Sequence, residues 1–245
     1  MSCGGTAEGI RFLSGPCEWR FMKLGVLGLQ GAVSEHVEAL RGALKTLGLE
    51  GEVRAVRRRD EVAALDGLVM PGGESTTISK LLRTFELHDL LVQRARDEDF
   101  PILGTCAGMI LLSSDGDVQV EKTETRLLGL MDMAVNRNAF GRQRESFEAP
   151  VDVSLLSAPF NAVFIRAPAV TRVWGKCEVL GTVDCSTLPR AADPKTGFTP
   201  PAEVGTAIVA ARQGNRMGLA FHPELTADTR LHQAFVETVR DWKKR

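Results

Sequence analysis

Short apolar runs alternate with helical patterns through the first half of the chain. Runs at 24–29, 52–56, 67–70 and 100–104 predict buried strands, because strands covered on both faces are apolar throughout. Between these runs apolar residues recur at helical spacing, and Ser34 is a candidate cap for the first helix. This alternation predicts an α/β fold with a doubly wound, mostly parallel sheet flanked by helices.

The pattern changes in the second half, where short apolar runs follow one another with little helical periodicity. The candidate strands there are 151–153, 162–165, 177–183, 207–210 and 217–221. We expect them to extend the first sheet and to add an antiparallel layer. A last helix follows, with Thr226 as its candidate cap. The stretch 184–203, rich in Pro, Asp and Thr, predicts a surface loop.

The composition is that of an ordinary globular protein, with 44% hydrophobic and 25% charged residues among 245. No linker rich in Pro, Gly and Ser divides the chain, which favours one domain over 23–245 after a flexible extension at 1–22. The extension lacks the basic start and continuous apolar stretch of a signal peptide. No apolar run reaches the ~20 residues that span a bilayer. We therefore expect a cytoplasmic protein.

Charge and cysteine usage narrow the classes of partner and cofactor. The formal net charge of −1 leaves no basic surplus to neutralise phosphates or anionic lipid, so nucleic acid and membrane surfaces are not expected partners. The five cysteines are odd in number and scattered along the chain. Their spacing fits neither a disulfide framework nor a zinc site. We expect no metal and no cofactor.

Cys106 lies between an apolar strand and an apolar helix, in the segment Gly104-Thr105-Cys106-Ala107-Gly108. A nucleophile on a sharp strand-to-helix turn needs small neighbours, because its backbone is strained and the substrate must approach closely. The N-terminus of the following helix also favours a thiolate. The same pattern fits a small buried residue packed under a tight turn, and the spacing leaves both interpretations open.

His222 is the best candidate for a base beside such a nucleophile. It follows an apolar strand and precedes Pro223-Glu224, at the carboxyl edge where open α/β sheets bind ligands. Glu224 is placed to orient the imidazole as the third member of a triad. Taken alone, the tripeptide fits an ordinary loop with a solvated carboxylate better. The other histidines lie in or beside helical stretches, where surface or packing roles are expected: His36, His88 and His232.

The turn Pro71-Gly72-Gly73-Glu74-Ser75 follows another predicted strand. Its glycines let backbone N–H groups turn toward a substrate where a helix begins, which makes a candidate oxyanion hole. A plain turn with Glu74 and Ser75 at the helix start fits the segment equally. A phosphate-binding P-loop does not, because the Lys-Ser/Thr pair is missing.

Six segments carry the pattern of one family, in the same order: 27–31, 71–77, 104–108, 138–143, 164–168 and 221–225. In these segments the chain resembles class I (triad) glutamine amidotransferases, and more narrowly the glutaminase subunits of pyridoxal 5′-phosphate synthases. The resemblance covers roughly residues 23–243. It implies a flavodoxin-like class I amidotransferase architecture with extra antiparallel strands.

The resemblance also implies a role for each matching residue. Cys106 would attack the carboxamide of L-glutamine, His222 would serve as base and then as acid for the leaving ammonia, and Glu224 would orient His222. The implied oxyanion hole consists of Gly72, Gly73 and Ala107. The implied glutamine-binding residues are Gly73, Glu74, Ser75, Arg137, Ile165 and Arg166. The implied partner is a barrel-shaped synthase subunit, which combines the ammonia with pentose and triose phosphates into pyridoxal 5′-phosphate.

Other functions remain as alternatives. A glutaminase subunit that feeds histidine, anthranilate or nucleotide synthesis is one, and the segments 27–31 and 138–143 argue against it. A non-catalytic binding module on the same scaffold and a cysteine peptidase are the others. A binding module could lose the triad, whereas Cys106, His222 and Glu224 are all present here.

Overall fold

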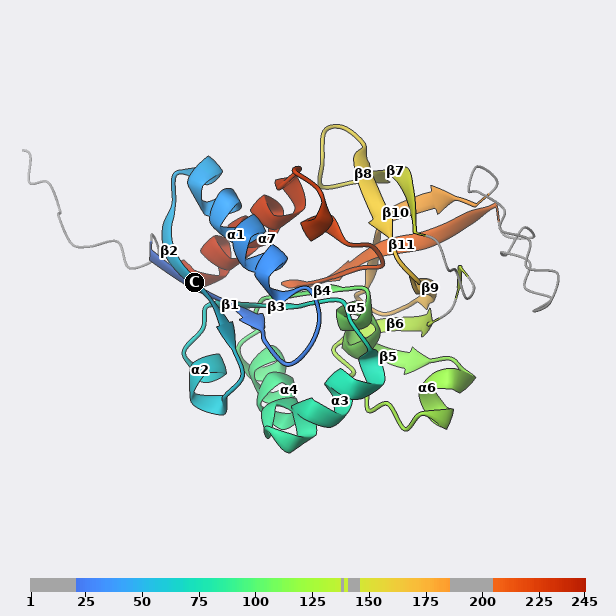
Figure 1. Cartoon of the computed structure of the whole chain (residues 1–245), viewed down its shortest axis with the longest axis horizontal. Helices are drawn as coiled ribbons and strands as arrows, with labels where there is room; N and C mark the ends of the chain where they lie inside the picture. The colour runs from blue at the N-terminus through green and yellow to red at the C-terminus, as the bar shows by residue number, and fades with distance from the viewer. Residues whose placement is uncertain (1–20, 138, 141–145, 186–204) are drawn as a thin grey trace, which may run out of the picture.

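A single twisted sheet runs through the molecule, with helices packed on both faces of its first half (Figure 1). The structure is a computed structural model and describes residues 21–137, 139–140, 146–185 and 205–245. Within these residues the α/β fold has the doubly wound, mostly parallel core that the alternating pattern predicts, followed by antiparallel strands.

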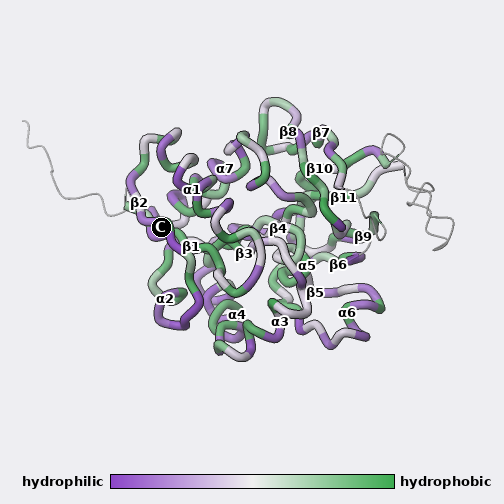
Figure 2. Tube along the Cα trace, viewed as in Figure 1, coloured by the Kyte–Doolittle hydropathy of each residue, from purple (hydrophilic) through white to green (hydrophobic). Residues whose placement is uncertain are grey.

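The parallel half of the sheet has the order β2-β1-β3-β4-β12, and every neighbouring pair in it is parallel. Its strands are β1 (Phe21–Leu27), β2 (Glu50–Val56), β3 (Gly67–Met70), β4 (Ile102–Thr105) and β12 (Arg216–Leu219). Every residue of β3 and β4 is buried, which explains why these strands do not alternate between apolar and polar residues and why only Thr105, at the end of β4, carries a polar side chain. Figure 2 shows the hydropathy of each residue along the sheet. The carboxyl ends of β3, β4 and β12 consequently meet at one edge of the sheet.

Antiparallel strands continue the sheet beyond β12. They are β11 (Thr206–Gln213), β10 (Glu178–Asp184), β7 (Phe147–Val153) and β8 (Phe160–Phe164). Three further strands branch from this path: β5 (Ser113–Gly116), β6 (Met131–Asn136) and β9 (Ala169–Val173). The hydrophobic pattern does not predict these three. β5 is polar and β9 is half exposed, so their pairing depends on neighbours that are distant in sequence.

Two layers of helices cover the parallel strands (Figure 1). On one face α1 (Val33–Leu47) packs against α7 (Arg230–Lys243). The other face carries α2 (Arg59–Ala63), α3 (Ser75–Thr84) and α4 (Leu87–Asp97), and α3 contacts α5 (Ala107–Leu112). The short elements α6 (Val118–Lys122) and the 3₁₀ turn η2 (Pro223–Leu225) complete the described helices.

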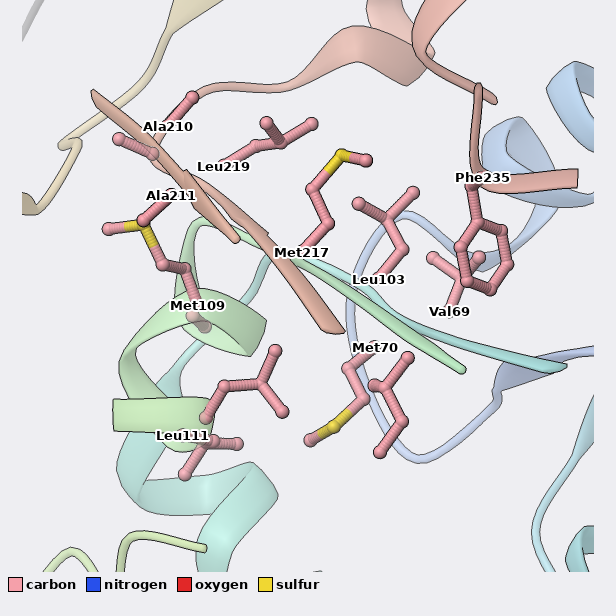
Figure 3. Close-up of a cluster of buried hydrophobic side chains, with 14 of the residues drawn as sticks. Val69, Met70, Leu103, Met109, Leu111, Ala210, Ala211, Met217, Leu219 and Phe235 are labelled. Atoms are coloured by element: carbon pink, nitrogen blue, oxygen red, sulfur yellow. The ribbon is translucent and has the colours of Figure 1, made fainter. Parts of the chain in front are cut away.

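The core fills both faces of the central strands (Figure 3). Apolar side chains from β3, β4 and β12 lie between α5 on one face and α7 on the other, and each of them is at most 2% exposed. The labelled members of this cluster are Val69, Met70, Leu103, Met109, Leu111, Ala210, Ala211, Met217, Leu219 and Phe235. This packing fixes the positions of the carboxyl ends of β4 and β12, where the loops that follow these strands begin.

Both predicted helix caps are wrong. The α1 helix begins at Val33, and the Oγ of Ser34 donates to Glu35 Oε2 at 3.0 Å instead of accepting from the backbone. The α7 helix begins only at Arg230, and the Oγ1 of Thr226 donates to the carbonyl of Pro223 at 3.0 Å. Thr226 therefore closes the 3₁₀ turn η2 that follows His222, a turn that the apolar periodicity does not reveal.

The sheet starts earlier than the predicted domain boundary at residue 23. Phe21 and Met22 belong to β1 and pair with β2, and the side chain of Met22 is fully buried. Residues 1–20 of the predicted extension lie outside the described residues, as do 186–203 of the predicted loop. None of the described helices combines the length and apolar character needed to cross a bilayer.

Candidate active site

Cys106 occupies a strained turn between β4 and α5. Its backbone has φ +47° and ψ −104°, a conformation that costs energy for a residue with a side chain and is typical of a nucleophile elbow. The flanking glycines, Gly104 and Gly108, allow this turn because other backbone atoms pack directly against them and leave no room for a Cβ. A Cβ on Gly104 would lie 2.6 Å from the carbonyl carbon of Gly108, and a Cβ on Gly108 would overlap the carbonyl oxygen of Met70. The structure therefore presents the thiol at the carboxyl edge of the sheet.

His222 and Glu224 reach Cys106 from the loop after β12. His222 Nδ1 lies 2.7 Å from Glu224 Oε1, and Cys106 lies close enough to the same ring to change its pKa. All three side chains are buried. Burial lowers the pKa of His222, but its hydrogen bonds with Cys106 and Glu224 and their charges outweigh burial and raise the pKa to about 10. His222 is therefore a cation at neutral pH, between a sulfur and a carboxylate.

The turn that carries Gly72 and Gly73 lies directly against these residues. A Cβ on Gly72 would overlap Cε1 of His222 and come within 3.2 Å of the Cβ of Cys106, so only glycine fits there. Gly73 has φ +156°, which also favours glycine. Gln30 Oε1 accepts a hydrogen bond from the backbone N–H of Glu74 at 2.8 Å and holds the turn from its other side. Backbone amides and the thiol are thus brought together.

Ala107 opens α5, so its N–H is among those that a helix leaves without an intrahelical acceptor. It follows Cys106 directly, which places a free helix-start amide next to the thiol. The Sγ of Cys106 lies 3.9 Å from the carbonyl of Ile165, and Ile165 itself is 38% exposed. Arg166 has φ +45°, a left-handed backbone that turns the chain at this point.

Glu74 and Arg137 pair with each other at the same edge. Arg137 donates to Glu74 Oε1 at 3.0 Å and to Thr123 Oγ1 at 2.9 Å. Glu74 is also the N-cap of α3, because its Oε2 accepts from the N–H of Thr77 at 2.7 Å. Burial opposes these contacts, but the hydrogen bonds and the Arg137 charge lower the pKa of Glu74 overall. Glu74 therefore has the capping role that the sequence offered for it, and also an ion pair with Arg137 that the sequence did not suggest.

Ser75 is buried beside this pair, and its hydroxyl has no hydrogen-bond partner within the described residues. A buried hydroxyl without a partner is costly in a finished site. The Ser75 hydroxyl is therefore able to accept or donate a further hydrogen bond at this edge of the sheet.

Two histidines that the sequence assigned to surface or packing roles lie behind Glu224. His36 of α1 and His232 of α7 are fully buried, and His36 Nδ1 lies 3.0 Å from His232 Nε2. The Nε2 of His36 lies 3.3 Å from Glu224 Oε2. A signal for them exists in the sequence, since each stands on the apolar stripe of an amphipathic helix. His88, for which the sequence suggested no partner, contacts the carbonyl of Leu127 at 3.1 Å.

The buried histidines are expected to make stability depend on acid pH. Burial lowers the pKa of His232 from 6.5 to about 4, and it holds that of His36 well below 6.5, aided by the rings of His232 and His222. As pH falls below 6.5 the unfolded chain takes up these protons first, so the free energy of unfolding decreases and levels off below the folded pKa. For His232 the loss is about 3 kcal/mol. Urea unfolding at a series of pH values from 7 to 4 measures it.

Acid also protonates carboxylates, so the matched comparison is His232→Gln, which removes one titrating ring. Its free energy of unfolding should fall less steeply between pH 6.5 and 4 than that of the unmodified chain. Parallel pH profiles for the two proteins would contradict a neutral buried His232.

A model of the SNO glutamine amidotransferase family matches residues 26–241. The "Pyridoxal 5'-phosphate synthase subunit PdxT" of Archaeoglobus fulgidus is 53% identical over 216 residues, covering 88% of this chain and 98% of the relative. The subunit of the same name from Methanosarcina barkeri is 47% identical over 218 residues, covering 89% of this chain and 98% of the relative. These matches extend over the described site and both halves of the sheet.

Solved structures agree with this likeness. The crystal structure of a glutamine amidotransferase superposes with a TM-score of 0.69 at 40% identity, covering 88% of this chain and 98% of that chain. A putative ThuA-like protein from Bacteroides uniformis has a TM-score of 0.53 at 15% identity, covering 98% of this chain and 95% of that chain. The second likeness is one of fold alone.

Proposed function

Because the chain belongs to the SNO glutamine amidotransferase family and is a glutaminase subunit of a pyridoxal 5′-phosphate synthase, we propose that Cys106, His222 and Glu224 are its catalytic triad. One observation carries the proposal. The strained Cys106 stands beside the ring of His222, and Nδ1 of that ring lies 2.7 Å from Glu224 Oε1. Nucleophile, acid–base and orienting group thus stand in one line.

The raised pKa of His222 decides how the first step proceeds. A protonated His222 beside Cys106 stabilises the thiolate, which attacks the carboxamide carbon of glutamine. The tetrahedral intermediate collapses to a thioester when His222 gives its proton to the leaving nitrogen, and ammonia departs. Neutral His222 then takes a proton from water as that water attacks the thioester. Glutamate leaves, and the thiolate–imidazolium pair is restored.

The backbone at the same edge offers donors for the oxyanion of both tetrahedral intermediates. We assign this role to the amides of Gly72, Gly73 and Ala107, since the glycine turn lies against Cys106 and Ala107 opens α5.

Glutamine also carries a carboxylate and an ammonium group. The Glu74–Arg137 pair supplies both opposite charges, and Ser75 supplies a free hydroxyl. Ile165 and Arg166 would complete the glutamine site beside the thiol.

The proposed partner is the synthase subunit that receives the ammonia and combines it with pentose and triose phosphates. The relatives that match nearly their whole length are subunits of pyridoxal 5′-phosphate synthase by name, which supports this partner. Such sugar phosphates are metabolites of the cytoplasm, where we propose that the complex works. The family match over 26–241 supports one glutaminase domain after the N-terminal segment.

The glutaminase is expected to depend on its synthase. Ammonia released without an acceptor is lost, and a misaligned oxyanion hole would prevent that loss. A glycine peptide such as Gly72-Gly73 reorients at little steric cost, and one displaced donor lowers the rate roughly 10²–10³-fold. We therefore expect a rise of about this size when synthase subunit is titrated into the chain, measured as glutamate release.

The control for this titration is Cys106→Ala with the same synthase, which reports background release. Equal turnover with and without synthase, while light scattering shows that the complex forms, would contradict the proposed control of the oxyanion hole by synthase. The assignment of glutaminase activity would still stand. Labelling of Cys106 by a glutamine-derived electrophile separates the glutaminase from a non-catalytic module or a peptidase.

A further inference from the structure

The line of polar contacts at the triad does not end at Glu224. It continues into the core through His36 of α1 and then His232 of α7, both fully buried. His36 is central to it, because one ring nitrogen faces His232 at 3.0 Å and the other faces Glu224 Oε2 at 3.3 Å. The same Nε2 also lies 3.1 Å from the hydroxyl of Thr105, the residue before the nucleophile.

Glu224 needs a partner on this side. Its Oε1 is occupied by His222, whereas its Oε2 is buried and has no formed hydrogen bond within the described part of the chain. An ionised carboxylate oxygen left bare in a core is costly, and it is free to rotate away from His222. The Nε2 of His36 stands 3.3 Å from it, but the hydrogen bond that Nε2 forms is with the hydroxyl of Thr105 at 3.1 Å, so donation to Oε2 requires the ring and the carboxylate to come into line. Catalytic contacts are often loose before the substrate complex forms and tighten in it.

The negative charge of Glu224 decides which ring nitrogen of His36 carries the proton. If His36 carried its proton on Nδ1, a lone pair on Nε2 would face the Glu224 carboxylate. With the proton on Nε2, that N–H bonds to the Thr105 hydroxyl and also faces Glu224 Oε2 at 3.3 Å, and Nδ1 accepts from the Nε2–H of His232. Burial and the adjacent histidine rings keep the pKa of His36 well below its ordinary value. His36 is therefore a neutral donor that leaves the negative charge of Glu224 available to His222.

We propose that His36 is a positioning residue of the glutaminase reaction, which donates a hydrogen bond to Oε2 of Glu224 and holds that carboxylate against His222. His232 fixes the ring of His36 in the required tautomer. The inference rests on the proposed function of Cys106, His222 and Glu224. A histidine that donates to a catalytic carboxylate from behind resembles the outer partners of metal-bound ligands, whose loss costs about 10–100-fold.

Two substitutions distinguish a hydrogen bond that His36 donates to Glu224 from a role of His36 in core packing alone. In His36→Asn the amide oxygen can take the place of Nδ1 and accept from His232, but no donor reaches Glu224. In His36→Gln the longer side chain places an N–H near the former Nε2. We expect kcat of the complex with synthase to fall about 10–100-fold in His36→Asn, with KM for glutamine unchanged. His36→Gln should recover most of the lost rate.

A double-mutant cycle with Glu224→Gln tests whether His36 acts through Glu224. If it does, His36→Asn lowers kcat by less than about 3-fold in a Glu224→Gln background, because no charge remains to be positioned. A role in supporting the elbow through Thr105 would instead lower kcat by the same factor in both backgrounds. His88→Gln is the matched control, since His88 is also buried in a helix but contacts Leu127 and Asp89. It should leave kcat unchanged.

The outcomes keep this inference apart from the proposed function. If the unmodified complex releases no more glutamate than Cys106→Ala, the proposed function fails. If that difference is clear and folded His36→Asn retains full kcat, or its loss is additive with that of Glu224→Gln, the positioning role is refuted. If circular dichroism shows that neither His36 variant folds, His232→Phe replaces them in the double-mutant cycle with Glu224→Gln. This variant keeps His36 but removes the Nε2–H that donates to its Nδ1. Full kcat in folded His232→Phe would then overturn the proposal.

Discussion

Replacing Cys106 with alanine is expected to abolish glutamate release by the complex with synthase while leaving the fold intact. No other nucleophile stands at the elbow between β4 and α5, so the covalent step is lost and the rate should fall about 10⁶-fold, to background. Alanine is smaller than cysteine and retains the backbone of the turn. Glutamate release in the presence of saturating synthase measures the effect, and thermal unfolding checks the fold.

The matched control is Cys177→Ala, because Cys177 is another buried free cysteine. Burial, with the charges of Asp132 and Glu178, raises the pKa of its thiol to about 11, which makes it a poor nucleophile. Its substitution should leave glutamate release largely unchanged. Turnover like that of the unmodified chain in folded Cys106→Ala would end the assignment of the nucleophile.

Glu224→Gln is expected to lower kcat by about 10³–10⁴-fold, less than loss of the nucleophile. The amide keeps the shape of the side chain but removes the charge that stabilises protonated His222 at 2.7 Å. The pKa of His222 should fall accordingly, so the alkaline limb of the pH–activity profile shifts to lower pH. Steady-state kinetics with synthase present, over a range of pH values, measure both effects.

Glu237→Gln on α7 serves as the control, because Glu237 is a half-exposed carboxylate in a surface ion pair with Arg240. Such pairs contribute little, and kcat should not change. Full activity of Glu224→Gln in the presence of synthase would reduce Glu224 to a loop carboxylate without a catalytic role.

The sequence pattern predicts the parallel half of the fold well and the rest less well. The strands β3 and β4 have apolar runs without alternation, ending in Thr105 in β4, because both faces are covered, and that property is local in the sequence. The strands β5 and β9 have no such pattern, since one is polar and the other half exposed. Their pairing is decided by partners such as β6 and β11, which lie elsewhere in the chain. Register between distant strands is not encoded in any one segment.

The candidate site divides in the same way. By itself the sequence determined that Cys106 stands on a strand-to-helix turn, because so tight a turn requires the glycines on either side of it. It also determined that His222 and Glu224 follow another strand, because an apolar run ends there and Pro223 comes next. It could not place His36 and His232, whose spacing is that of core residues in amphipathic helices. Only the packing of α1 against η2 brings His36 to Glu224, across 188 residues of sequence, and its packing against α7 adds His232. Contacts between helices depend on the whole core, so the tertiary structure alone decided that a line of polar contacts runs from Glu224 to His36 and His232.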